Sequence, residues 1–269
     1  MRPPEAQSPR VSTDTANART PRRGVGRLLR PVIWLLVAAL LVIAAWQGAP
    51  RLLERSGLDQ SAMPWGPECT VSIDGAEETT ALTVAEAREA STAVAVAARA
   101  GDEAEVSGID EEVLDQLRHG PEQDAGPSLT CRANSTEGLE REEMTESGLT
   151  PRAETLLAET REVFGDVSVG GFEPGGVDEG HSEGSTHYEG RAVDVFFRPV
   201  TEESRREGWL LAHWLVAHAE ELDVSVVIFD DHIWSMALSA AGWRDYEVGT
   251  DDEVLRHLDH VHVDVQQGD

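Results

Sequence analysis

The residues of this 269-residue chain best suited to chemistry lie in two short stretches near its C-terminal end. In the first, His187 and Asp194 are separated by six residues, and Gly190 between them permits a turn. In the second, His260 and His262 alternate with valines, which is the period of a half-buried strand with both imidazoles on one face. Two imidazoles and one carboxylate are the ligand set of an open zinc site with water in the fourth position, and a spare histidine could carry protons.

A second strand is needed to bring Asp194 toward these histidines. The residues from Ala192 to Phe197 have the character of a strand, and Asp194 would emerge on the same face as Ala192. The small alanine side chain leaves room beside the carboxylate. The sequence therefore predicts two strands that meet around one metal ion, whose water would ionise near neutral pH as a hydrolase requires.

Both stretches resemble known zinc motifs. The segment Thr-His-x-x-Gly-Arg-Ala-Val-Asp, ending at Asp194, and His-x-x-His-x-His, ending at His262, resemble the motif pair of the D-Ala-D-Ala metallopeptidase and hedgehog-type fold. That group includes zinc DD-carboxypeptidases and murein endopeptidases. The resemblance covers roughly residues 148–266. Within it, the stretches 226–234, 242–244 and 258–263 are similar to a branch of that fold found in exported actinobacterial proteins.

The resemblance implies a role for each histidine of the two motifs. It implies His187, Asp194 and His262 as the ligands of a zinc ion. His260 would then lie beside the metal as general base or transition-state stabiliser. His257 corresponds to a further histidine that takes part in catalysis in some members, whereas other members use a glutamate as the base.

One position departs from the family pattern. The family usually carries an arginine in a Gly-Tyr/Phe-Arg-Ser/Pro segment before the first zinc histidine, and this arginine helps to hold the substrate or the developing oxyanion. Here Glu173 takes its place, in Gly-Phe-Glu-Pro. A glutamate has the wrong sign of charge to stabilise an oxyanion, so the departure bears on turnover rather than on the fold.

The N-terminal region predicts a membrane anchor. Residues 1–30 are polar and contain seven arginines, and we expect a disordered cytoplasmic tail. Residues 31–50 carry no charge and are just long enough to span a bilayer as a helix. A cleaved signal peptide and a buried core helix are the alternatives. The arginines place the tail in the cytoplasm, so that after a linker at 51–63 the rest of the chain is extracellular.

The charge distribution agrees with this topology and excludes one class of partner. All 22 basic residues are arginine, and the formal net charge is −28. Residues 51–269 hold 48 acidic residues against 15 arginines, a net charge of −33. Such a surface repels nucleic acid. It could attract divalent cations or reflect a saline habitat, and a solvated acidic surface is the simplest reading.

Residues 64–132 are predicted to form a small extracellular α/β unit. Strand-like alternation begins at Cys69, and the sequence from Thr83 to Glu86 matches a capping box that starts an alanine-rich helix. Cys69 and Cys131, the two cysteines of the chain, bracket this unit. Because thiols are oxidised outside the membrane, we predict a Cys69–Cys131 disulfide, with two free thiols as the alternative.

The remaining chain is predicted to be an acidic linker followed by the zinc domain. Residues 133–147 are polar without apolar periodicity. Residues 148–269 show helices that begin at Thr150-Pro151 and at Thr201, the latter reaching about Leu222, and several short strands. Helices packed on a small antiparallel or mixed sheet give an α+β domain.

For the five other histidines, a structural role is weighed against a functional one. His213 and His218 lie on the helix after Thr201 and are expected at the edge of the core or on the surface, and His119 in a loop. His181 lies in a loop with six glycines over 170–186, and we favour a plain loop residue over one that lines a cleft. His232 could touch substrate or be structural.

Three functions fit these observations. The first is a membrane-anchored zinc peptidase that cleaves peptidoglycan stem peptides at the cell wall. The second is a zinc-binding but catalytically weak module that binds wall peptide or a protein, which Glu173 favours. The third is an envelope scaffold with structural zinc, against which three ligands with spare histidines argue, because structural zinc is usually four-coordinate and closed.

Overall fold

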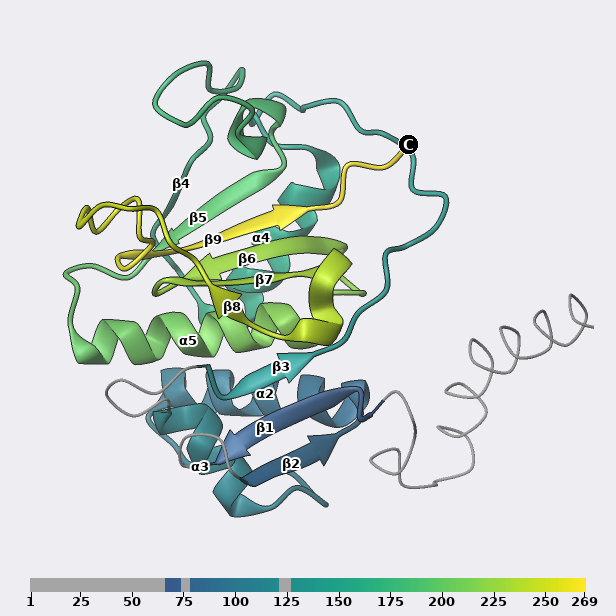
Figure 1. Ribbon diagram of the computed structural model, residues 1–269, viewed down its shortest axis with the longest axis vertical. Coiled ribbons are helices and arrows are strands. Elements are labelled where there is room, and N and C mark those ends of the chain that lie inside the picture. The colour runs from purple at the N-terminus through teal and green to yellow at the C-terminus, as the bar shows by residue number, and fades with distance from the viewer. Residues whose placement is uncertain (1–65, 74–77, 121–126) are drawn as a thin grey trace, which may run out of the picture. The chain divides into compact units, whose positions relative to one another are not determined.

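A computed structural model describes residues 66–73, 78–120 and 127–269 (Figure 1). They belong to one compact unit, Asp59–Asp269. Within these ranges, no helix combines the length and the apolar character that crossing a membrane requires. The expected tail, transmembrane helix and linker, at 1–30, 31–50 and 51–63, lie outside the described residues.

The C-terminal part is built on a six-stranded antiparallel sheet in the order β4-β5-β9-β6-β7-β8. The last strand of the chain, β9 (His260–Val265), lies inside the sheet between β5 (Ala192–Phe196) and β6 (Val224–Phe229). The outer strands are β4 (Val169–Gly170), β7 (His232–Ser235) and β8 (Arg244–Asp245). The mixed α+β architecture with antiparallel sheets is as predicted.

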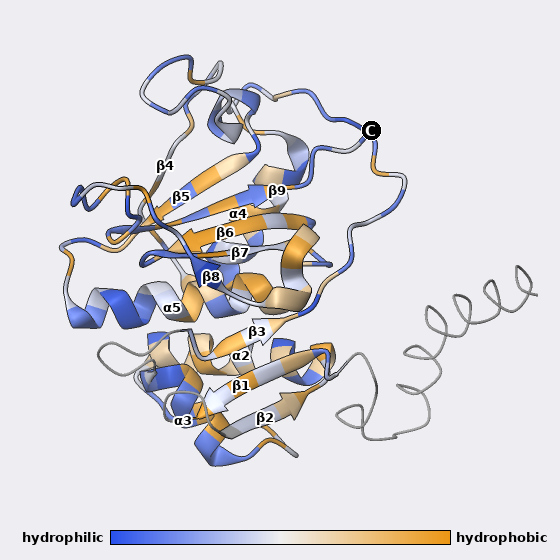
Figure 2. Ribbon diagram, viewed as in Figure 1, coloured by the Kyte–Doolittle hydropathy of each residue, from blue (hydrophilic) through white to orange (hydrophobic). Residues whose placement is uncertain are grey.

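Alternation in β9 separates a core face from a polar face. Val261, Val263 and Val265 are all at most 1% exposed and belong to the hydrophobic core. The other face of the strand carries His260 and His262. Figure 2 shows apolar residues along β6 and both apolar and polar residues in β9, in agreement with the two faces of that strand.

Two helices pack against this sheet, and Figure 1 shows α4 behind it. Helix α4 (Pro151–Phe164) begins as predicted, with the Thr150 hydroxyl accepting from the backbone of Ala153. Helix α5 (Glu202–Ala217) is capped by Thr201. It ends before the expected Leu222, because a turn that closes at Asp223, with φ of 51°, leads directly into β6.

The segment before residue 133 forms a second layer of sheet and helices. Strands β1 (Cys69–Ile73), β2 (Glu78–Leu82) and β3 (Leu129–Cys131) form an antiparallel sheet in the order β2-β1-β3. Cys69 and Cys131 face each other across β1 and β3 and form the predicted disulfide. Helix α2 (Val84–Ala100) has the predicted capping box and ends at Gly101.

Helix α3 (Glu111–His119) was not predicted from the sequence, which placed His119 in a loop. Two sequence features could have predicted this helix: the two glutamates of its first turn, and the helical spacing of its buried Val113, Leu114 and Leu117. Both α2 and α3 pack against α5, so the apolar residues of this segment and of residues 148–269 form one continuous core. The boundaries predicted at 64–132, 133–147 and 148–269 stay predictions.

The acidic stretch 133–147 contains neither helix nor strand, as its composition suggests. It is nevertheless tied to the body of the protein. The Thr136 hydroxyl donates to Asp223 at 2.6 Å, and the Asn134 backbone N–H donates to Glu220 at 2.7 Å. The stretch therefore lies along the C-terminal part of the molecule.

Candidate metal centre

His187 is positioned by a short helical turn at the end of the glycine-rich loop. The 3-10 helix η2 (Thr186–Glu189) begins at Ser185, whose hydroxyl accepts from the backbone N–H of His187. It ends at Gly190, which adopts the left-handed conformation that glycine allows, and the chain then enters β5. The turn expected at Gly190 thus brings His187 to the end of the strand that carries Asp194.

Strand pairing brings Asp194 and His262 together. They are direct partners in the antiparallel register of β5 and β9, and both are buried. Directly opposed residues lie within a few ångströms of each other on the same face. One residue on each of two central strands thus supplies a carboxylate and an imidazole side by side, as the alternation predicted.

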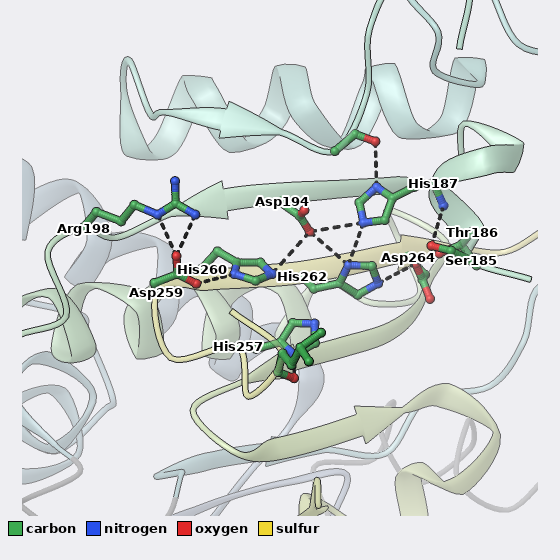
Figure 3. A network of polar contacts seen from close by, with 12 residues as sticks. Ser185, Thr186, His187, Asp194, Arg198, His257, Asp259, His260, His262 and Asp264 are labelled. Atoms are coloured by element: carbon green, nitrogen blue, oxygen red, sulfur yellow. Dashed lines mark hydrogen bonds and ion pairs between the residues drawn. The ribbon is translucent and has the colours of Figure 1, made fainter. Parts of the chain in front are cut away.

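Three donor atoms converge in this cluster (Figure 3). His187 Nε2 lies 3.3 Å from Asp194 Oδ1 and 3.2 Å from His262 Nδ1, and His262 Nδ1 lies 3.0 Å from Asp194 Oδ1. A tetrahedral zinc ion with bonds of about 2.0–2.2 Å separates its ligand atoms by about 3.3–3.6 Å. The three atoms therefore match one face of a zinc tetrahedron, and the described residues offer no fourth donor to this group.

Hydrogen bonds behind the cluster decide which nitrogens carry protons. His187 Nδ1 lies 2.7 Å from the carbonyl oxygen of Gly171, and His262 Nε2 lies 2.9 Å from Asp264 Oδ1. Both partners are acceptors, so these two nitrogens donate, and a ring that binds a metal ion as a neutral ligand would have its lone pair on the nitrogen that faces Asp194. Two such nitrogens and a carboxylate that converge suit a cation between them, and metal-binding histidines generally have their second nitrogen hydrogen-bonded in this way.

The pKa shifts of the cluster residues are consistent with a site that holds a positive charge. Burial lowers the pKa of His262, but the carboxylates of Asp264 and Asp194 raise it to about 10. Burial raises the pKa of Asp194, whereas hydrogen bonds from His187 and His262 lower it by more, so that this carboxylate stays ionised. A proton on His262 thus takes the place of the positive charge that a metal ion would supply.

Zinc binding is expected to weaken as the pH falls, since zinc and a proton compete for His262. Because its metal-free pKa is about 10, the proton is bound at neutral pH and must leave when zinc enters. Because one proton must be released, the apparent affinity for zinc falls by about tenfold for each unit by which the pH is lowered. Titration against a competing chelator at about pH 6 and about pH 8 measures this slope. Asp264→Asn should reduce this dependence of zinc affinity on pH. An equal slope in the native protein and in the variant would show that zinc and a proton do not compete for His262 in this way.

Gly171 is required where the glycine loop crosses the cluster. Its φ is +80°, and a Cβ there would overlap the His187 ring and lie 3.0 Å from Asp194 Oδ2. We expect Gly171→Ala to displace His187 and to weaken zinc binding by about 10–100-fold, the range for groups that support a ligand. Gly175→Ala is the matched control, because Gly175 has φ of +92° but open space around its Cβ position. Equal zinc affinities of the two variants would refute the steric requirement.

His260 lies beside the cluster rather than in it. Its Nε2 is 3.7 Å from Asp194 Oδ1, and its Nδ1 is 2.7 Å from Asp259 Oδ1. Asp259 is buried and accepts from Arg198 Nε at 2.6 Å. Neither Asp259 nor Arg198 was singled out in the sequence, since their contact joins positions 61 residues apart.

Two further histidines border the site. The ring of His257 lies 4.7 Å from that of His260 and 5.5 Å from that of His262. Burial, followed by the neighbouring His260 and His262, lowers its pKa to about 3, so His257 is neutral at physiological pH. His181 lies in the loop as expected, and its ring stacks on that of His187 with centroids 4.0 Å apart.

The other histidines belong to the scaffold. His213 is 1% exposed and accepts from the Ser128 backbone N–H, so it lies inside the core rather than at its edge. Its position on the inner face of α5, between Trp209 and Ala217, could have indicated this. His232 Nδ1 donates to the carbonyl of Asp230 at 2.6 Å, and His119 ends α3.

Comparison with protein families gives one match. The family model described as VldE, C-terminal domain, matches residues 145–255. Searches of curated proteins and of solved structures gave no match. The matched segment includes His187 and Asp194 and stops before His257, His260 and His262. The chain is thus similar to that domain over less than half of its length, and the assignment of the centre depends on its geometry.

Proposed function

We propose that the protein is a membrane-anchored, extracytoplasmic zinc peptidase of the D-Ala-D-Ala metallopeptidase type that acts on peptidoglycan stem peptides. The observation that carries the proposal is the spacing of three donor atoms, 3.0–3.3 Å apart, on one face of a zinc tetrahedron. An open fourth position is typical of catalytic rather than structural zinc. The arginine-rich tail and apolar segment at 1–50 support the location.

The side chains around the cluster suit hydrolysis of an amide bond. A bound zinc ion supplies a Lewis acid that polarises a carbonyl and lowers the pKa of water. His260 presents Nε2 toward the cluster, so it can accept the proton of an attacking water and return it to the leaving amine. His257 is neutral and adjacent, and can hydrogen-bond to the substrate or relay this proton.

A second candidate function is zinc-dependent binding of wall peptide or a protein without fast turnover. The observation that favours it is Glu173, which is exposed two residues after Gly171. The family arginine expected at this position would stabilise a developing negative charge, and a carboxylate would oppose it.

Digestion of muropeptides by the full chain, purified in detergent, tests the proposal. We expect peptide-bond cleavage that a chelator abolishes and that added zinc restores. Binding of muropeptides without any cleavage would select the second function. Cleavage that persists in chelator after the metal has been removed would refute zinc catalysis.

Glu173→Arg separates the two functions further. If the missing arginine limits turnover, this change should raise cleavage while zinc content stays the same, because Glu173 is exposed and is not one of the three ligands. Glu179→Arg, an exposed position in the same loop, controls for the change of charge alone. Equal rates in both variants would show that another group stabilises the oxyanion.

A further inference from the structure

Three residues outside the zinc-binding group form a continuous chain of contacts that ends beside it. Arg198 Nε and Nη2 each lie 2.6 Å from Asp259 Oδ2, and the other oxygen of this carboxylate lies 2.7 Å from His260 Nδ1. Figure 3 shows the three side chains in a row that leads toward Asp194. We propose that Asp259 and Arg198 are positioning residues, which fix the ring orientation and tautomer of His260 so that its Nε2 is the basic nitrogen facing the metal centre.

Strand register explains why these residues meet. Phe196, the last residue of β5, is the direct partner of His260, the first residue of β9. The pairing continues one step further, where the Phe197 backbone N–H donates to the carbonyl of Asp259 at 2.8 Å. Arg198 follows immediately. The antiparallel ladder thus places an arginine beside an aspartate at the edge of the site.

The carboxylate of Asp259 is well suited to orient an imidazole. Its side chain is 7% exposed, so water competes little for its two oxygens. One oxygen accepts from the guanidinium and the other from His260 Nδ1–H. Since Nδ1 carries the proton, the lone pair of the neutral ring is on Nε2, which lies 3.7 Å from Asp194 Oδ1.

Arg198 is held in turn without being buried. Its side chain is 52% exposed, and its guanidinium carbon lies 4.1 Å above the Phe196 ring. Stacking of this kind fixes the plane of a guanidinium. The arginine therefore keeps the Asp259 carboxylate ionised and correctly turned, and acts on His260 only through it.

The state of the His260 ring in zinc-loaded full-length protein tests the inference without any substrate. Nitrogen-15 NMR of labelled histidine should find the His260 proton on Nδ1 in the native chain. In Asp259→Ala the proton should be distributed over both nitrogens, with zinc content unchanged. Asp259→Leu, which has no acceptor and leaves no cavity, serves if the alanine variant does not fold. A His260 tautomer that is the same in a folded Asp259 variant as in the native chain would overturn the inference.

The kinetic test of this positioning role rests on the proposed function. On muropeptides, Asp259→Ala should lower kcat by about 10–100-fold with little change in KM, since substrate contacts remain. Arg198→Ala should lower kcat less, and Arg198→Lys should recover part of the loss because it restores the charge. Arg88→Ala is the matched control: it removes an ion pair between α2 and the turn that follows α5, and kcat should stay native.

The two claims can fail separately. If the native chain cleaves nothing while the Asp259 variant changes the His260 tautomer, the proposed peptidase is wrong and the positioning is right. If cleavage is fast and kcat is unchanged in folded Asp259→Ala, the positioning role is wrong and the peptidase stands.

Discussion

Replacement of His187 or Asp194 by alanine should remove zinc from the protein. Each residue supplies one of three donor atoms, and two remaining side chains seldom hold zinc tightly. Hydrolysis should be lost together with the metal. His262→Ala should behave in the same way, because its Nδ1 completes the group. Elemental analysis of the purified variants measures the bound zinc directly.

His260→Ala should differ from the ligand variants. Its Nε2 lies beside Asp194 but outside the three-atom group, so about one zinc per chain should remain. Cleavage should fall by about 10²–10⁴-fold, which is the contribution typical of a general acid–base group. His119→Ala controls for loss of an imidazole elsewhere, on α3, and should keep both zinc and activity.

Two results would contradict these assignments. If His260→Ala loses zinc while His262→Ala retains it, the roles of the two histidines on β9 are exchanged. If no variant changes the zinc content, the centre does not bind the metal.

Loss of the disulfide should be the largest effect on stability. Cys69 and Cys131 are buried, face each other in register, and are 62 residues apart in the chain. Closing a loop of that length restricts the unfolded state, so Cys131→Ser should lower the free energy of unfolding by about 2–5 kcal/mol. Denaturant titration with and without reductant measures the difference.

The double variant Cys69→Ser with Cys131→Ser separates the bridge from side reactions of a free thiol. It should be destabilised as much as the single variant, and reductant should not affect it. If both cysteines of the folded native protein react with a thiol reagent, the predicted loss of stability does not apply.

Periodicity made much of the site predictable. The alternation of β9 predicted that His260 and His262 lie on one face, and Gly190 indicated the turn that brings His187 near Asp194. These are local properties, which neighbouring residues determine. Helix starts at Thr150 and Thr201 were equally readable, because caps depend on residues three or four positions apart.

Contacts between distant segments were not readable from the residues alone. Spacing could not distinguish His262 from His260 as the ligand; the pairing of Asp194 with His262 across β5 and β9 makes the difference. The same holds for Asp259 with Arg198, whose contact depends on where two strands end. The stacking of His181 on His187 could not be predicted, because a glycine-rich loop has no period from which to infer its path.

One carboxylate links the loop of the metal centre to its sheet. Asp264 accepts from the Thr186 hydroxyl at 2.5 Å and lies 2.9 Å from His262 Nε2, so it binds the turn that carries one histidine to the strand that carries the other. The centre is therefore preorganised: its ligands are arranged before any ion arrives. Chelation should accordingly leave a folded protein, and hydrogen exchange should quicken in the loop around Thr186 while the amides of β9 stay protected.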